Sequence, residues 1–130
     1  MPKIKLGARP KTFEHTLKVK LTDGTEGVLP LTYRYRTRTE FGEFIDGLFR
    51  QAKVTPASTD TEDVRFSLRE ALERTRDSNA DYILQIVEGW GLDEEFSRES
   101  VVQLCDELPG VAVEIIERYR LACTEGRLGN

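Results

Sequence analysis

The chain has 130 residues, 38% of them hydrophobic and 32% charged, which suits one domain with a real core and long solvated helices. No stretch approaches the roughly 18 to 20 apolar residues that span a membrane, and the N-terminus lacks the apolar run of a secretory signal, so we expect action in a cytosol. Residues 1–38 carry nine Lys and Arg against three acids, whereas residues 39–130 hold ten basic and twenty acidic residues. This acidic remainder argues against broad binding to nucleic-acid phosphates.

The two cysteines, Cys105 and Cys123, each fall among apolar residues of a predicted helix, where a thiol is usually inert and buried. We therefore expect packing residues rather than a redox pair, and no disulfide in a reducing compartment. His15 is the single histidine and there is no Cys-x-x-Cys pattern. The sequence accordingly predicts no metal site and no cofactor.

The N-terminal part predicts a flexible basic arm at 1–12 and a β-hairpin at 13–38. Apolar and polar residues alternate in both halves of the hairpin, and Asp23-Gly24 between them supplies the positive φ angles of a tight turn. Pro30 cannot donate to a ladder, so we predict that the second strand is an edge strand, or is bulged at that point.

Beyond residue 38 the apolar residues change to helical spacing. Thr37-x-x-Glu40 is a capping-box pattern at the start of the first predicted helix. The segment 54–63 is polar and has no apolar pattern, which predicts a mobile loop. The part from residue 39 to the C-terminus is therefore predicted to be helical around one loop.

Two further helices are predicted before the tryptophan. Ser67-x-x-Glu70 opens a short helix by the same capping-box pattern. Asp77-Ser78-Asn79 then interrupts the pattern and is suited to cap the next helix. Gly89 is expected to end that helix as a left-handed C-terminal cap.

The last third of the chain predicts a helical hairpin. Ser97 caps one helix, Pro109-Gly110 forces a sharp turn with Pro109 in the first position of the closing helix, and Gly126 ends it. We therefore predict one α+β domain over residues 1–130. It has an N-terminal antiparallel β-hairpin or small sheet, followed by about five short α-helices that end in the helical hairpin.

The sequence contains no arrangement typical of catalysis. His15 lies on the apolar face of a predicted strand, where packing is favoured over a role as general base. The acidic run Asp93-Glu94-Glu95 precedes a helix N-terminus, where carboxylates meet the helix dipole favourably, and we favour this over a cation site. A phosphate-binding glycine loop is also missing. We therefore expect a protein that is not an enzyme.

The segment Tyr33 to Arg38, in which tyrosines alternate with arginines, is the strongest candidate for nucleic-acid binding. Aromatic rings stack on bases and arginines hold phosphates, so an exposed strand could offer both. A strand sends alternate residues to opposite faces, however. We favour tyrosines in the core and arginines facing water or the acidic helices.

Trp90 is the single tryptophan, and it lies between two glycines. Leu92 and Phe96 follow it at short range. We favour a core anchor that holds a loop against helices, and a contact for a partner protein is the alternative.

Several segments in the second half of the chain resemble a known family when they are taken in order. These segments are Val87–Trp90, Asp93–Glu99, Leu108–Gly110 and Ile115–Asn130. The chain is similar to the tail assembly chaperones of long-tailed bacteriophages and prophages, most clearly from Asp77 onward. The N-terminal hairpin and first helix match in general layout, and Gly129 stands where the family often has a lysine.

The resemblance implies a transient, non-catalytic role in the cytoplasm of the host bacterium. Such proteins bind the tape-measure protein, keep its hydrophobic segments from aggregating, and help tail-tube subunits to polymerise around it. They are absent from the finished virion. The partners expected are therefore the tape-measure protein and the tail-tube protein, with neither nucleic acid nor membrane, and a homo-oligomer is left open.

Two rival functions remain at this point. One is a small nucleic-acid-binding phage protein that uses the Tyr33–Arg38 strand, and the other is a structural protein of the tail or of the head–tail joint. The side chains that we predict to contact a partner are Tyr33, Tyr35, Trp90, Leu92, Phe96, Tyr119 and Arg127.

Overall fold

The computed structural model of the chain describes residues 6, 7, 9–51 and 68–126. The predicted loop at 54–63, the Ser67 capping position and Arg127 lie outside the described residues, as does about half of the predicted arm at 1–12. Within the described part, no helix combines the length and the apolar character needed to cross a membrane.

The predicted hairpin is confirmed. Strand β1 (Thr12–Lys20) pairs antiparallel with β2 (Glu26–Arg34) over the full length of both. At the turn, Gly24 has a φ of 87° and its N–H donates to the carbonyl of Leu21 at 2.9 Å. Glycine suits this left-handed backbone conformation because it has no Cβ. The second strand ends at Arg34 rather than at residue 38, because Thr37 already caps the first helix.

The second strand is central rather than at an edge, so the prediction made from Pro30 is wrong. Strand β3 (Val87–Trp90) pairs antiparallel with the other side of β2 and gives the order β1-β2-β3. Pro30 is tolerated because its carbonyl accepts from Gly91, just past the end of β3, so its missing N–H would point beyond the ladder. The register shift lies between Thr32 and Tyr33, not at the proline.

Helix α2 (Leu68–Ile86) runs without a break through the predicted interruption at Asp77–Asn79. Its apolar positions Ala80 and Ile83 are fully buried, and this packing outweighs the preference of the polar tripeptide for a cap. The described residues therefore contain four helices, one fewer than about five. Gly89 lies in β3 without a positive φ, so its predicted role as a helix cap is wrong as well.

The predicted N-terminal caps of two helices are confirmed. At α1 (Arg38–Gln51), the Thr37 N–H donates to the Glu40 carboxylate at 2.9 Å, and the Glu40 N–H donates to the Thr37 hydroxyl at 3.2 Å. At α3 (Arg98–Glu107), the Ser97 hydroxyl accepts from the third residue of the helix. These bonds satisfy N–H groups that a helix start leaves without partners.

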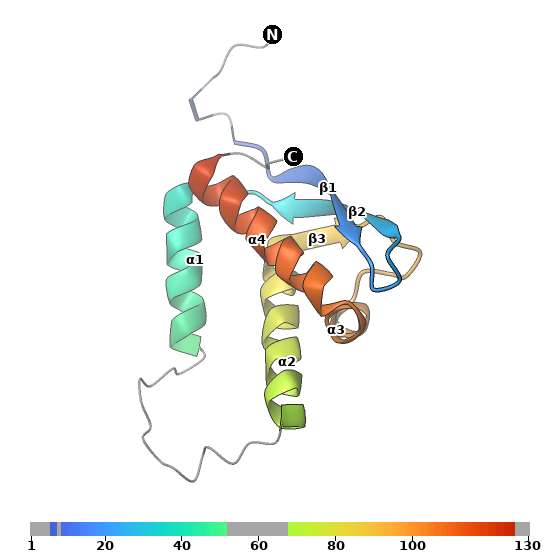
Figure 1. Cartoon of the computed structure of the whole chain (residues 1–130). Helices are drawn as coiled ribbons and strands as arrows, with labels where there is room; N and C mark the ends of the chain where they lie inside the picture. Colours follow the sequence, from blue (N-terminus) through green and yellow to red (C-terminus); the bar gives the residue numbers. More distant parts are fainter. Residues whose placement is uncertain (1–5, 8, 52–67, 127–130) are drawn as a thin grey trace, which may run out of the picture.

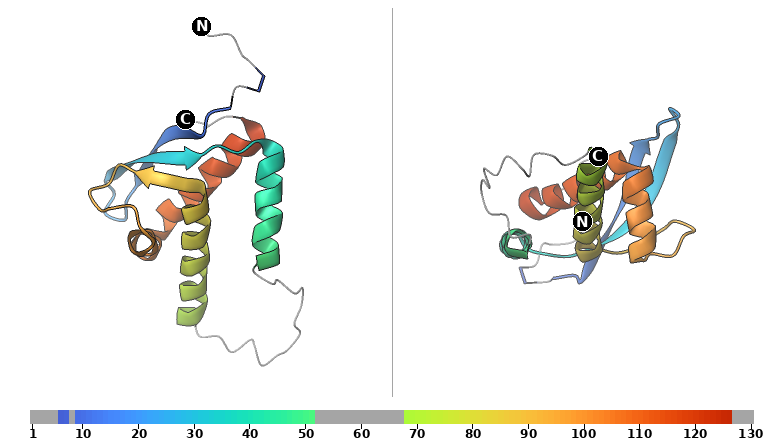
Figure 2. Two further views of the ribbon diagram at one scale, coloured as in Figure 1. Left: turned by 180° about the vertical axis from the view of Figure 1, so that it is seen from behind. Right: turned by 90° about the horizontal axis from the view of Figure 1, so that it is seen from below.

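Helix α4 (Pro109–Glu125) follows α3 directly, with Pro109 in its first turn and Gly126, at a φ of 70°, as its C-terminal cap. The two predicted closing helices are therefore present, but α3 is seen end-on in Figure 1 where α4 runs across the view, so they cross steeply and do not form the predicted hairpin. Figure 1 shows α4 lying across one face of the sheet, with α1 and α2 extending from it side by side. Seen from behind, the strands lie in front of α4, so the described helices cover one face of the sheet and leave the other open (Figure 2).

One apolar core joins the sheet to the helices. Tyr33 on β2 and Tyr119 on α4 lie at its centre with ring centroids 5.3 Å apart. Phe41 and Phe44 attach α1 to this core, because Phe41 meets Tyr119 edge-on and Phe44 meets Tyr82 of α2 in the same way. The remaining buried residues include Leu17, Leu29, Leu31, Ile83, Ile86, Val87, Val101, Leu104, Val111 and Ile115.

Both cysteines are free and buried, as the sequence predicted. Cys105 lies on α3 and Cys123 on α4. Burial raises the pKa of the Cys105 thiol to about 11, and it also raises the pKa of Cys123. A thiol that stays protonated at neutral pH is a poor nucleophile, so both side chains behave as small apolar packing residues.

Candidate functional site

Tyr33 and Tyr119, two of the predicted contact residues, have no exposed surface. The Tyr33 hydroxyl donates to the carbonyl of Ile115 at 2.8 Å, and the Tyr119 hydroxyl donates to the carbonyl of Arg34 at 2.9 Å. Burial raises the pKa of both phenols well above the ordinary range. In the folded chain these tyrosines fasten the sheet to α4 and offer nothing to a partner.

Arg36 belongs to the same arrangement. Its guanidinium lies 4.1 Å from the centroid of the Phe44 ring and donates to the Tyr119 hydroxyl at 2.9 Å and to the carbonyl of Gln85 at 3.2 Å. A cation over an aromatic face in a half-buried site is a stabilising contact. With Tyr33 buried and Arg36 engaged, the Tyr33–Arg38 segment does not present the row of exposed rings and cations that nucleic-acid binding would use.

Tyr35 is half-buried and lies apart from the other predicted contact residues. The Arg9 guanidinium is 5.8 Å from the centroid of its ring. Tyr35 lines a groove at the C-terminal end of α4, together with Arg38, Ala122 and Gly126. Tyr35 also lines a second groove, together with Arg34, Glu40 and Glu88.

Trp90 and Phe96 meet at the end of β3, and Leu92 lies between them in the chain and packs against the core; we call these three residues the Trp90 cluster. The Trp90 and Phe96 rings meet edge-on with centroids 5.1 Å apart, and the indole N–H donates to the carbonyl of Glu94 at 2.8 Å. All three side chains are half-buried. These contacts support the expected role of Trp90 as the anchor of the 91–97 loop.

The Trp90 cluster has an acidic rim. Four exposed carboxylates follow β3 within ten residues, and α3 begins among them. Arg98, which lies between Glu95 and Glu99 in the chain, pairs with Asp81 of α2, so the excess charge of this stretch is negative and suits a partner that carries basic side chains. The residues of this rim are Asp93, Glu94, Glu95 and Glu99.

A second apolar surface, which the sequence analysis missed, lies on the first half of α2. Leu68 and Leu72 are 75% and 60% exposed and stand one turn apart. They border a groove of about 540 Å³ that also reaches Cys105 of α3 and Pro109 of α4. We call this the α2 groove. Helical spacing placed both leucines on an apolar face, but it could not show that no described element covers them.

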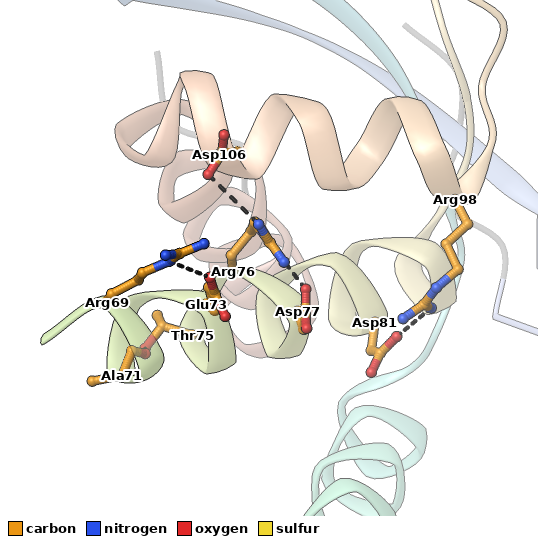
Figure 3. A network of polar contacts seen from close by, with 9 residues as sticks. All are labelled: Arg69, Ala71, Glu73, Thr75, Arg76, Asp77, Asp81, Arg98 and Asp106. Atoms are coloured by element: carbon orange, nitrogen blue, oxygen red, sulfur yellow. Dashed lines mark hydrogen bonds and ion pairs between the residues drawn. The ribbon is translucent and has the colours of Figure 1, made fainter. Parts of the chain in front are cut away.

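Charged pairs hold the walls of the α2 groove. On α2, Arg69 pairs with Glu73 at 3.1 Å, and Arg76 pairs with Asp77 at 3.0 Å while reaching Asp106 of α3 at 3.8 Å (Figure 3). Exposed pairs of this kind contribute little stability each, about 0 to 1 kcal/mol. These pairs place charged side chains on both sides of the apolar surface formed by Leu68 and Leu72.

Across 9–51 and 68–126, no three His, Cys, Asp or Glu side chains gather where they could hold a metal ion. His15 is half-buried, and burial, with the charge of Arg118 as the second cause, lowers its pKa. A neutral imidazole against the core agrees with the packing role predicted for it.

A three-stranded sheet with helices on one face and apolar side chains left exposed defines a small α+β domain suited to protein binding. The chain belongs to the phage tail assembly chaperone family, whose family model matches residues 1–130. This confirms the resemblance seen most clearly from Asp77 onward and extends it over the whole sequence. Searches of curated proteins and of solved structures give no match.

Proposed function

We propose that this protein binds the tape-measure protein in the cytoplasm of the host bacterium. It shields hydrophobic helical segments of that client until tail-tube subunits polymerise around it, and it is released before the virion is complete. Membership of the phage tail assembly chaperone family supports this role. Non-catalytic holding of a client also agrees with the buried, protonated thiols and the packed histidine.

The observation that carries the proposal is the α2 groove. An amphipathic client helix places apolar residues on one stripe and binds by laying that stripe along a groove. Leu68 and Leu72 supply two apolar contacts one helical turn apart. Burying both would contribute about 2 to 4 kcal/mol, enough for a reversible complex when a few further contacts add to it.

Co-expression with the tape-measure protein tests this site. We expect the wild-type chain to co-purify with its client and Leu72→Glu to lose most of that binding, because the substitution removes an apolar contact and the introduced carboxylate would have to lose its hydration. Leu72 is 60% exposed, so the substitution should leave the fold intact. Val113→Glu is the matched control, because Val113 is 55% exposed on α4 and is not among the residues that line the groove.

Equal co-purification of the wild type and Leu72→Glu would exclude the α2 groove as the client site. The acidic rim of the Trp90 cluster is then the next surface to test, by the charge reversals Asp93→Lys and Glu95→Lys. Failure of the wild-type chain to co-purify at all would count against tape-measure binding itself. Detection of the chain in purified virions would favour the rival role as a structural tail protein.

A further inference from the structure

The outer edge of β1 is a nine-residue strand edge without a partner among the described residues. The sheet order is β1-β2-β3, so β1 is a terminal strand. Near its C-terminal end, a groove runs between Val19 of β1 and Val111 at the start of α4. A long unpaired edge of this kind is a template for pairing with another strand. The β3 edge is only four residues long.

The hydrogen bonds of the hairpin show which backbone groups of β1 point outward. The Tyr35 N–H donates to the Lys11 carbonyl at 3.0 Å, and the Leu21 N–H donates to the Thr25 carbonyl at 2.7 Å. Odd-numbered residues of β1 therefore bond to β2, because hydrogen-bonded and non-bonded pairs alternate in an antiparallel ladder. Thr16 fits this pattern, since it lies opposite Pro30, which cannot donate. Thr12, Glu14, Thr16, Lys18 and Lys20 thus direct their N–H and C=O groups away from the sheet.

We propose that two copies of this chain pair antiparallel through β1, about a two-fold axis at Thr16, to form a dimer with a continuous six-stranded sheet. This register brings all nine residues of each strand into pairing. It sets Glu14 opposite Lys18 of the second copy, and the symmetry repeats that contact. Moving the axis to Glu14 or to Lys18 would set like charges against each other, which disfavours those registers.

The charges of β1 lack partners within the described part of the molecule. Glu14 lies opposite Thr32 and Lys18 opposite Val28 on β2, and neither takes part in an ion pair there. Lysine on a sheet edge ordinarily discourages non-specific pairing. In the proposed register Lys18 instead selects a second copy of this chain, because it meets a carboxylate only when the strands align about Thr16.

The helix-covered face of the sheet is also compatible with this pairing. Phe13 would lie opposite Val19 of the second copy, and both are half-buried and packed against the core. His15 would lie opposite Leu17 of the second copy. Pairing would extend the apolar layer under the sheet across the two-fold axis and would bury no unpaired charge.

The test is the mass of the full chain in solution, measured by light scattering on a size-exclusion column across a concentration series. We expect the wild type to be a dimer. Glu14→Lys alone and Lys18→Glu alone should each raise the dimer dissociation constant about tenfold or more, because each turns two attractive cross-strand contacts into repulsive ones. An equimolar mixture of the two variants should form a heterodimer, since the lysine introduced in one variant then faces the glutamate introduced in the other.

Recovery in the mixture requires both variants to be folded, so it separates pairing from misfolding. Glu88→Lys is the control, because it makes the same charge change on β3 at the opposite edge of the sheet and should leave the dimer intact. A monomeric wild type at every concentration overturns the proposal. So does a dimer that resists Glu14→Lys, or a mixture that stays monomeric. The measurement contains no client, so its outcome is independent of tape-measure binding.

Discussion

Tyr119 shows how much of this small fold depends on single polar atoms. Its hydroxyl donates to the Arg34 carbonyl and accepts from the Arg36 guanidinium, both at 2.9 Å, while its ring lies in the core against Tyr33. A hydroxyl buried with both partners in place stabilises the fold, and its removal leaves both partners without a bond. The sequence analysis named Tyr119 only as a predicted contact for a partner, and the sequence contained no sign of this bridge.

We expect Tyr119→Phe to lower the free energy of unfolding by about 1 to 2 kcal/mol, because it leaves the Arg34 carbonyl and the Arg36 guanidinium each short of a partner. Urea denaturation followed by circular dichroism measures the change. Tyr35→Phe is the matched control, since no hydrogen bond of the Tyr35 hydroxyl is found in the described structure, and it should stay within about 0.5 kcal/mol of wild type. Equal losses in the two variants would contradict the bridge.

The ionised carboxyl of Glu40 predicts how the stability of the fold changes at acidic pH. The hydrogen bond from Arg9, followed by that from the Thr37 N–H, lowers the pKa of its carboxyl from 4.5 to about 2. A carboxyl whose pKa is lowered by folding stabilises the protein above pH 4.5, and this contribution is lost as the pH falls toward 2. We expect urea midpoints to fall in this window for the wild type and to fall less for Glu40→Gln. Identical pH profiles of the two proteins would contradict the assignment.

At the scale of elements, α2 shows where local preference loses to packing. Asp77-Ser78-Asn79 is a strong capping sequence, yet the helix continues through it because Ala80, Ile83 and Ile86 keep one face buried without a break. The same helix then passes directly into β3, which the sequence analysis had assigned to a helix end. Four residues are too short a run to reveal a strand by alternation alone.

Substitution of Ser78 and Ser97 distinguishes a serine inside a helix from a serine that caps one. Ser78 is exposed inside α2, so Ser78→Ala should raise the stability by up to about 0.5 kcal/mol through helix propensity. Ser97 caps α3, so Ser97→Ala should cost about 1 kcal/mol. Thermal or urea unfolding of both variants measures the difference. A destabilising Ser78→Ala would indicate that α2 is capped at this point after all.

At the scale of the whole molecule, the two surfaces that we assign to partners lie on different parts of the fold. The α2 groove lies between the first half of α2 and the junction of α3 with α4. The β1 edge lies at one side of the sheet (Figure 1). A dimer through β1 would leave the α2 groove of each copy open. Two client sites in one particle would raise the effective affinity for a client that carries several apolar helices, without any new contact.

The proposed dimer predicts a thermal stability that depends on concentration. Association through β1 stabilises the folded state by mass action, so the Tm of the wild type should rise as the protein is concentrated. Glu14→Lys should weaken that dependence, and Glu88→Lys should retain it. Differential scanning calorimetry at several concentrations measures this. A Tm of the wild type that does not change with concentration would count against the dimer.

The sequence by itself determined the features that depend on neighbouring residues. These are the Asp23-Gly24 hairpin, the caps at Thr37 and Ser97, and the turn at Pro109-Gly110, because each rests on a few backbone angles and local hydrogen bonds. The order of motifs from Asp77 onward was also enough to indicate the family, since order and spacing are properties of the chain.

Only the tertiary structure decided which residues lie in the core and which stay exposed at the surface. It placed β2 at the centre of the sheet despite Pro30, buried Tyr33 and Tyr119, and left Leu72 uncovered by any described element. The periodicity of a helix or strand shows which residues share a face, but not what packs against that face, because its partner comes from a distant part of the chain. The candidate binding surfaces therefore became visible only in the folded molecule.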